Sequence, residues 1–167
     1  QMAGEFLMAP QFDVEVASNE AEKFGFKDKV DGVSALDVLV KAHELIFGDD
    51  FTKDSADAYL VAPDTGYVAT IFGEKTSANG FILNGGYPND GMQLPNGGYM
   101  GTTVTTQAVT DGDTVEFFTY QDASYWTDNV TWFCRNGAFT DTITAVPAGS
   151  VELTLKGIPF MNGYKYK

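Results

Sequence analysis

The sequence has one cysteine, one histidine and only ten lysine and arginine residues among its 167. A single cysteine, Cys134, excludes the intramolecular disulfides on which small secreted domains often depend. A single histidine, His43, excludes a zinc site built from several His or Cys ligands. Because 23 acidic residues face so few basic ones, the formal net charge is −13. Such a surface repels nucleic-acid phosphates and anionic lipids, so neither is expected as a partner.

Long hydrophobic runs are also missing. None approaches the ~20 residues that a membrane helix needs, so no direct membrane insertion is expected. The chain does contain 13 Phe, 8 Tyr and 2 Trp, enough aromatic area for a real core, and 18 Gly, many of them beside Asn or Asp. Frequent turns between apolar segments favour a strand-rich domain over a helical bundle. The length suits one domain, or one domain with a fragment of another.

One helix is predicted over residues 34–47. Ser34 is a good N-cap residue, and Asp37 follows three positions later in a capping-box arrangement. Gly48 can adopt the left-handed conformation that ends a helix. The apolar stripe that this helix would pack against a sheet consists of Leu36, Leu39, Val40, His43, Ile46 and Phe47.

The rest of the chain is predicted to form short strands. Phe12, Val14 and Val16 alternate with acidic residues, a pattern typical of a half-buried strand. Residues 17–32 are expected to form a loop, and residues 84–101 a long one. The Asp111–Gly112 pair predicts a hairpin between its flanking strands. The other strands are predicted at Ala58–Val61, Tyr67–Phe72, Phe81–Leu83, Thr102–Val109, Thr114–Tyr120, Asn129–Phe133, Phe139–Ala145 and Ser150–Leu155.

Five segments in this order resemble the transcobalamin C-terminal-like domain: Phe12–Val16, Ser34–Leu39, Gly66–Gly73, Phe81–Gly86 and Asp111–Phe117. That family is a small β-grasp-type module found in many Gram-positive surface proteins, mostly without known function. The resemblance covers roughly residues 11–120. The chain departs from the family in having Phe81 where a Trp or Tyr is usual, and in its insertion at residues 87–101.

The predicted fold is therefore α+β, with a β-grasp-like mixed or antiparallel sheet, one packed helix and additional C-terminal strands. Residues 1–10 are expected to be an expression remnant or a disordered start. Residues 11–133 are expected to form the transcobalamin C-terminal-like domain. Residues 134–167 would add strands that either complete the sheet or begin a neighbouring domain.

No catalytic or metal-binding residues are predicted. His43 lies on the apolar stripe of the helix, where a packed imidazole with one hydrogen bond is expected. Cys134 has strand-like apolar neighbours and is expected to be a buried thiol. The Asp111–Asp113 turn is explained by backbone requirements. An acidic loop could offer calcium ligands, but its spacing does not match an EF-hand; its members are Asp49, Asp50, Asp54 and Asp57.

The candidate binding residues are aromatic and amide side chains, which suit sugars, peptides and protein partners. The same residues could instead cover the open edge of a small sheet and its core. The candidates are Asn84, Tyr87, Tyr99, Tyr120, Tyr125, Trp126 and Asn129.

The sequence and the resemblance together predict a non-catalytic extracellular module of a larger bacterial surface protein, located at the cell wall. It would bind a protein, glycan or small molecule, as in adhesion, or display other domains, and no cofactor is expected. Two alternatives remain open. The first is a binding domain for a small corrinoid-type ligand, and the second is a carboxylate-dependent glycan hydrolase.

Overall fold

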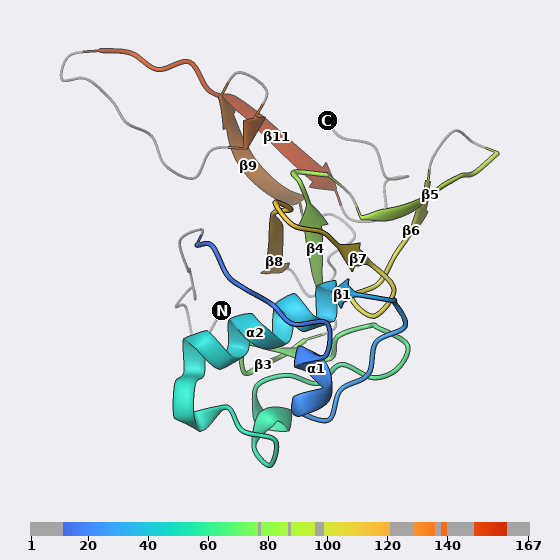
Figure 1. Cartoon of the computed structure of the whole chain (residues 1–167). Helices are drawn as coiled ribbons and strands as arrows, with labels where there is room; N and C mark the ends of the chain where they lie inside the picture. Colours follow the sequence, from blue (N-terminus) through green and yellow to red (C-terminus); the bar gives the residue numbers. More distant parts are fainter. Residues whose placement is uncertain are drawn as a thin grey trace.

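The computed structural model describes residues 12–76, 78–86, 88–95, 99–120, 129–135, 138–139 and 149–159. It confirms the α+β class, with one main helix and several small antiparallel sheets (Figure 1). The α-helices are α1 (Glu20–Lys23) and α2 (Ala35–Phe47), followed by the 3-10 helices η1 (Gly48–Asp50) and η2 (Ala56–Ala58). The strands are β1 (Val33–Ser34), β2 (Thr70–Ile71), β3 (Glu74–Lys75), β4 (Asn79–Leu83), β5 (Asn89–Gln93), β6 (Tyr99–Gly101), β7 (Ala108–Val109), β8 (Val115–Thr119), β9 (Asn129–Arg135), β10 (Ala138–Phe139) and β11 (Thr154–Pro159).

Helix α2 confirms the local prediction at both ends. The Ser34 hydroxyl accepts a hydrogen bond from the Asp37 amide at 3.0 Å, and the Asp37 carboxylate accepts one from the Ser34 amide at 2.9 Å. Each bond satisfies an amide that the helix itself leaves unpaired. Gly48, with φ +54°, ends the helix, and that conformation is strained for residues with a Cβ.

The hydrophobic core lies beneath α2 and is shared with β2, β4, β8 and the loops between them. Leu36, Leu39 and Val40 are fully buried on one side of α2. Val115 and Phe117 of β8 pack against the same cluster, half-buried. The cluster is completed by buried residues from the loops and from β2 and β4: Phe26, Phe51, Leu60, Val68, Ile71, Phe81 and Val104.

Strand β8 pairs with β4, so the predicted hairpin around Asp111–Gly112 is wrong. The register runs antiparallel from Asn79 opposite Thr119 to Leu83 opposite Val115. Strand β7 pairs instead with β1. The physical reason is that the segment before the turn supplies hydrogen-bond acceptors to the first amides of α2, which lack partners within the helix. The Ala35 and Leu36 amides donate to the carbonyls of Gln107 and Val104, which draws this segment away from β8.

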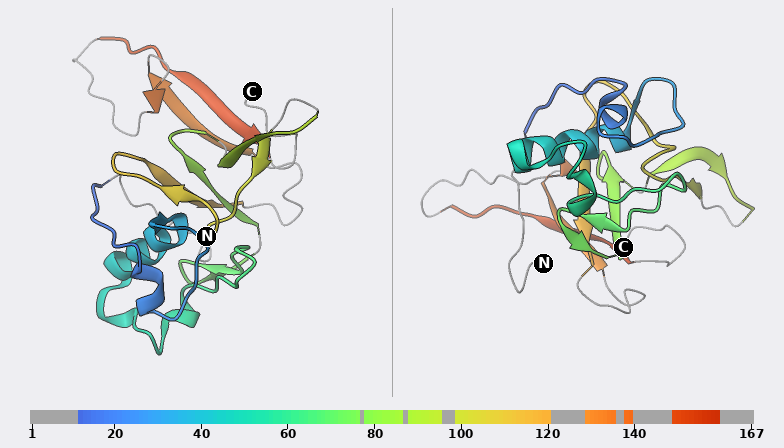
Figure 2. Two further views of the ribbon diagram at one scale, coloured as in Figure 1. Left: turned by 45° about the vertical axis from the view of Figure 1, so that its right-hand side comes forward. Right: turned by 90° about the horizontal axis from the view of Figure 1, so that it is seen from below.

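The predicted long loop at residues 84–101 contains a hairpin instead. Strands β5 and β6 pair antiparallel, with Asn89 opposite Gly101 and Gln93 opposite Tyr99. The Thr102 amide donates to the Pro88 carbonyl and closes the base of the hairpin. Figures 1 and 2 show it extending away from α2.

Two further expectations at the start of the chain are wrong. Residues 12–16 form no strand, and Phe12 and Val14 are 45% and 37% exposed. The alternation is a local pattern, but a strand also needs a neighbouring edge, and no described strand pairs with this segment. The predicted loop at 17–32 contains α1, whose Glu20 and Ala21 are buried against α2.

The two strands predicted around the Pro63–Gly66 turn are much shorter than expected. The structure retains one isolated bridge, between Val61 and Thr70. Strand β2 turns directly into β3 through Phe72 and Gly73, with Ile71 opposite Glu74. Tyr67, predicted to start a strand, is 75% exposed.

The last strands form a sheet of their own, in the order β10–β9–β11. Thr131 of β9 pairs with Gly157 of β11 in an antiparallel register. Figures 1 and 2 show this sheet beyond β4 and β8, at the far end of the molecule from α1. Among the described residues it shares no ladder with β4 or β8, and β9 crosses the boundary expected between residues 133 and 134.

Candidate functional site

His43 is a structural residue, as predicted, but it makes two hydrogen bonds where one was expected. Its Nδ1 lies 2.8 Å from the Leu39 carbonyl oxygen, and its Nε2 accepts the Phe72 amide hydrogen at 2.9 Å. Because Nε2 is the acceptor, the proton belongs on Nδ1, which donates to Leu39. The imidazole is fully buried and stacks on the Phe72 ring, with centroids 4.6 Å apart.

Burial among aromatic rings keeps this imidazole neutral. Desolvation lowers the pKa of His43 to about 4, against the smaller opposing effect of the carbonyls of Leu39 and Tyr59. At neutral pH both ring nitrogens are therefore used by the fold. A general base needs a free nitrogen beside its substrate, and His43 has neither free nitrogen nor solvent access.

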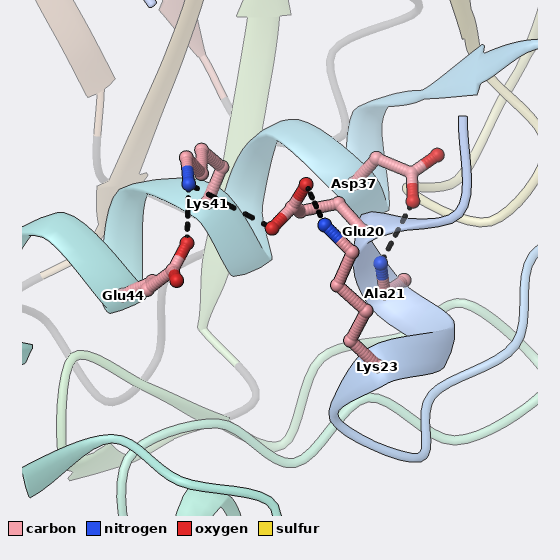
Figure 3. Close-up of polar contacts among 6 residues, drawn as sticks. All are labelled: Glu20, Ala21, Lys23, Asp37, Lys41 and Glu44. Carbon is pink, nitrogen blue, oxygen red and sulfur yellow. Dashed lines mark hydrogen bonds and ion pairs between the residues drawn. The ribbon is translucent and has the colours of Figure 1, made fainter. Parts of the chain in front are cut away.

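Between α1 and α2 lies a buried acid with two basic partners (Figure 3). The Glu20 side chain is 4% exposed, and its oxygens lie 2.9 Å from Lys23 Nζ and 3.7 Å from Lys41 Nζ. Lys41 also pairs with Glu44. Desolvation by burial would raise the pKa of Glu20, but the hydrogen bond to Lys23 and the positive charges of Lys41 and Lys23 together lower it. This acid is fixed as a carboxylate that ties α1 to α2.

Asp37 has a second role besides capping its own helix. Its Oδ1 accepts the Ala21 amide hydrogen of α1 at 2.8 Å, as Figure 3 shows, while its Oδ2 accepts from the Ser34 amide and hydroxyl at 2.9 Å each. The residue is fully buried. Its neighbour Asp28 has a raised pKa, because of burial and the nearby Asp37 carboxylate, although a hydrogen bond to Ser34 acts in the other direction.

Asn84, a predicted ligand residue, is exposed, but its amide closes a turn within the chain. Its Nδ2 donates to Asp113 Oδ1 at 2.8 Å, and its Oδ1 accepts the Thr114 amide hydrogen at 2.9 Å. Asp113 also accepts hydrogen bonds from the amide and hydroxyl of Thr110. The hydrogen bonds from Asn84 and Thr110 lower the pKa of Asp113. The backbone role expected for the Asp111–Asp113 turn is thereby confirmed.

Tyr120, another predicted ligand residue, follows β8 on the face turned away from α2. Phe117 packs against the core, so the alternation of a strand places Glu116, Phe118 and Tyr120 on the opposite face. The rings of Phe118 and Tyr120 meet edge to face, with centroids 5.4 Å apart. The Phe118 ring lies over Gly80 of β4, where an added Cβ would clash with it.

Glu116 was missed from the sequence and is the unusual acid of this face. Burial raises its pKa, and among the described residues no basic or hydrogen-bonding group is recorded as its partner. The residue opposite it on β4, Ile82, is 2% exposed although it lies outside the cluster beneath α2. The signal that could have found Glu116 was its period-two spacing from Phe118 and Tyr120.

The structure places the remaining predicted residues only in part. Tyr87, Tyr125 and Trp126 lie outside the described residues, while Tyr99 and Asn129 begin β6 and β9. Asn84 and Tyr120 are not brought together. They follow opposite ends of the β4–β8 ladder, about 20 Å apart at the usual rise per residue of a strand.

Neither a metal site nor a membrane span is found in the part of the chain that the structure describes. No three His, Cys, Asp or Glu side chains gather there as metal ligands would, and no helix there is long and apolar enough to cross a bilayer. No protein-family model matches the sequence, and neither a curated protein nor a solved structure is significantly similar to it. The resemblance to the transcobalamin C-terminal-like domain therefore stays a prediction.

Proposed function

We propose that this chain is a non-catalytic module of β-grasp type from a larger bacterial surface protein, which binds a partner or displays other domains. The observation that carries the non-catalytic part is the state of His43. Both of its nitrogens bond to backbone groups, at 2.8 and 2.9 Å, inside an aromatic cluster. The one side chain that titrates near neutral pH when unperturbed is thus used in folding.

The β-grasp assignment is supported by the packing of α2 against the antiparallel β4–β8 pair. A single helix across a small sheet is the arrangement that the resemblance implies. The surface location is supported by the net charge of −13 and by a sequence without disulfides, which suits bacteria that do not use them at the cell surface.

The binding role is supported by the outer face of β8, which is the face turned away from α2 that carries Glu116, Phe118 and Tyr120. Phe118 and Tyr120 are half-buried, their rings meet edge to face, and strand alternation places Glu116 on the same face. Flat apolar rings next to a polar group suit the faces of sugars and the side chains of peptides. Tyr120 is therefore the predicted ligand residue that we retain, with Glu116 and Phe118 added to it.

A thermal-shift screen tests this function. The intact chain would be scanned with calcium, cobinamide, cell-wall and host glycans and short peptides, and the same mixtures would be assayed for turnover. We expect at least one ligand to raise the melting temperature in a dose-dependent way, without turnover. Turnover of a glycan that one Asp or Glu substitution abolishes would contradict the proposal. A shift with cobinamide alone would instead favour a corrinoid carrier.

Two tyrosine variants then locate the binding face. We expect Tyr120→Ala to reduce the ligand-induced shift several-fold while the unliganded protein keeps its circular dichroism spectrum. Tyr67→Ala is the matched control, because Tyr67 is 75% exposed and lies outside β8. Equal loss of binding in both variants would show that the outer face of β8 is not the site.

A further inference from the structure

One side chain of α2, that of His43, bonds to the turn between β2 and β3. The Phe72 amide donates to His43 Nε2 at 2.9 Å across a separation of 29 residues. The Phe72 ring stacks on the imidazole, with an angle of 11° between the two planes. The next amide, that of Gly73, donates to the Tyr59 carbonyl at 2.9 Å. The turn is thus fixed by contacts with residues outside the β2–β3 pair.

Phe72 also has an unfavourable backbone conformation. Its φ is +50°, in the left-handed region that is uncommon for residues with a side chain. Such a conformation persists only where surrounding contacts impose it. Both the hydrogen bond to Nε2 and the ring stack on Phe72 come from His43, while the Phe72 side chain also packs against the core cluster.

We propose that His43 is an acid-sensitive latch, and that protonation of its Nε2 releases the turn formed by Phe72 and Gly73 while α2 remains folded. A proton from solvent occupies the lone pair that now accepts the Phe72 amide. Two N–H groups then face each other, and that hydrogen bond is lost. The Tyr59 carbonyl, whose interaction with the imidazole favours the charged form, is the new acceptor.

The surroundings of the imidazole leave this proton transfer to His43 alone. The rings of Phe47, Phe51 and Phe72 pack against it. Tyr59 packs against Phe47, with the two ring centroids 4.4 Å apart, and completes these aromatic surroundings. The charged residues on the elements around His43 do not contribute to the shift of its pKa; they are Lys41, Glu44, Asp49, Asp50, Asp57, Glu74 and Lys75.

Amide hydrogen exchange by NMR on the full chain tests the latch. Between pH 7 and pH 4 we expect exchange at Phe72 and Gly73, corrected for its intrinsic pH dependence, to accelerate at least tenfold. The amides of Leu39 and Val40 in α2 should keep their protection over that range, and a return to pH 7 should restore the turn. Loss of protection at all four amides at the same pH would overturn the proposal, because His43 would then report only global unfolding.

Two further measurements keep the test decisive. In His43→Gln the side chain cannot titrate, so we expect the turn amides to lose their acid response; an unchanged response would contradict the latch. If that variant does not fold, the nitrogen-15 shifts of the wild-type imidazole decide. They should show a proton on Nδ1 at pH 7 and titration below pH 5, whereas titration near pH 6.5 would overturn the proposal.

Discussion

Two glutamates on opposite sides of the core are treated in opposite ways. Glu20, between α1 and α2, is almost fully buried but has ammonium groups at 2.9 and 3.7 Å, and its pKa is lowered. Glu116, on the outer face of β8, is only half-buried, yet burial raises its pKa, and no described residue is recorded as its basic partner. The more deeply buried carboxylate, that of Glu20, is thus the one whose desolvation is offset by positive charges.

The difference shows in which part of the molecule the buried polar groups bond to one another and so stabilise the fold. On the side of α1 and α2, Asp37, Glu20 and His43 each bond to groups from another segment. Desolvation of these groups is offset by specific partners. On the outer face of β8, Glu116 shares a strand face with Phe118 and Tyr120, and no partner among the described residues offsets its desolvation, which suits a surface whose partner is another molecule.

The largest effect should come from removing the carboxylate that joins α1 to α2. Asp37→Ala leaves the amides of Ala21 and Ser34 without their acceptor inside the protein. Unpaired buried donors of this kind and the lost capping box should lower the free energy of unfolding by about 3–5 kcal/mol. Urea denaturation at pH 7 measures this change.

The exposed Asp57 provides the matched control for that substitution. Asp57→Ala removes a solvated carboxylate and should change the free energy of unfolding by less than about 0.5 kcal/mol. Equal effects of the two substitutions would mean that the network between the helices does not stabilise the fold, and the contrast with β8 would disappear.

The next effect is the dependence of stability on pH through His43. Its folded pKa of about 4 lies below the ordinary 6.5, so the unfolded chain binds the proton first as the pH falls. The stabilisation is complete above pH 6.5 and should decrease by about 3 kcal/mol between pH 7 and pH 4. Urea denaturation at several pH values measures it. His43→Gln should show a flatter profile, and parallel profiles would assign the acid sensitivity to the carboxylates instead.

A smaller effect is expected at Asn84, on the strand side of the molecule. Asn84→Ala loses the bonds to Asp113 and Thr114 and must also hold a φ of +51° without the Asn side chain. We expect a loss of about 1–2 kcal/mol, measured by urea denaturation.

A glycine at this position separates the two causes. Asn84→Gly should lower the free energy of unfolding by only about 0.5–1 kcal/mol, because glycine tolerates the positive φ. Unchanged stability in both variants would contradict the structural role of the amide and return Asn84 to the group of ligand residues.

Local chemistry explains what the sequence could predict. Helix α2 was predicted because Ser34, Asp37 and Gly48 mark its ends and its apolar stripe is contiguous in sequence. The buried position of His43 followed from the same stripe. Strand pairing was harder to predict from the sequence. Asn79 pairs with Thr119, 40 positions further along the chain, and no local pattern specifies that choice.

The same reasoning applies to the candidate site. Tyr120 was identified by its residue type, and the alternation of its strand would have added Phe118 and Glu116. Glu116 remained hidden because its burial, and the lack of a basic partner among the residues that the structure describes, are visible only in three dimensions. Conversely, the bonds from Asn84 to Asp113 and Thr114 cross about 30 residues, so the sequence alone suggested a free amide.

The sharpest test compares Glu20→Gln with Glu116→Gln. At pH 7 Glu20→Gln should lower the free energy of unfolding by about 1 kcal/mol, because Lys23 and Lys41 lose their shared partner. Glu116→Gln should instead raise the melting temperature, because it removes a carboxylate whose charged form is disfavoured by burial.

The dependence of both effects on pH identifies their cause. The stabilisation by Glu20 is present above the ordinary pKa of 4.5 and is lost as the pH falls through its lowered folded value. The penalty at Glu116 is present at neutral pH and is relieved as the carboxylate takes up a proton. Melting curves at pH 7 should therefore place Glu20→Gln below the wild type and Glu116→Gln above it in melting temperature. At pH 3.5 the melting temperatures of both variants should approach that of the wild type. A destabilised Glu116→Gln at pH 7 would mean that the carboxylate already has a partner within the chain, and the outer face of β8 would then belong to the fold as fully as the contact between α1 and α2.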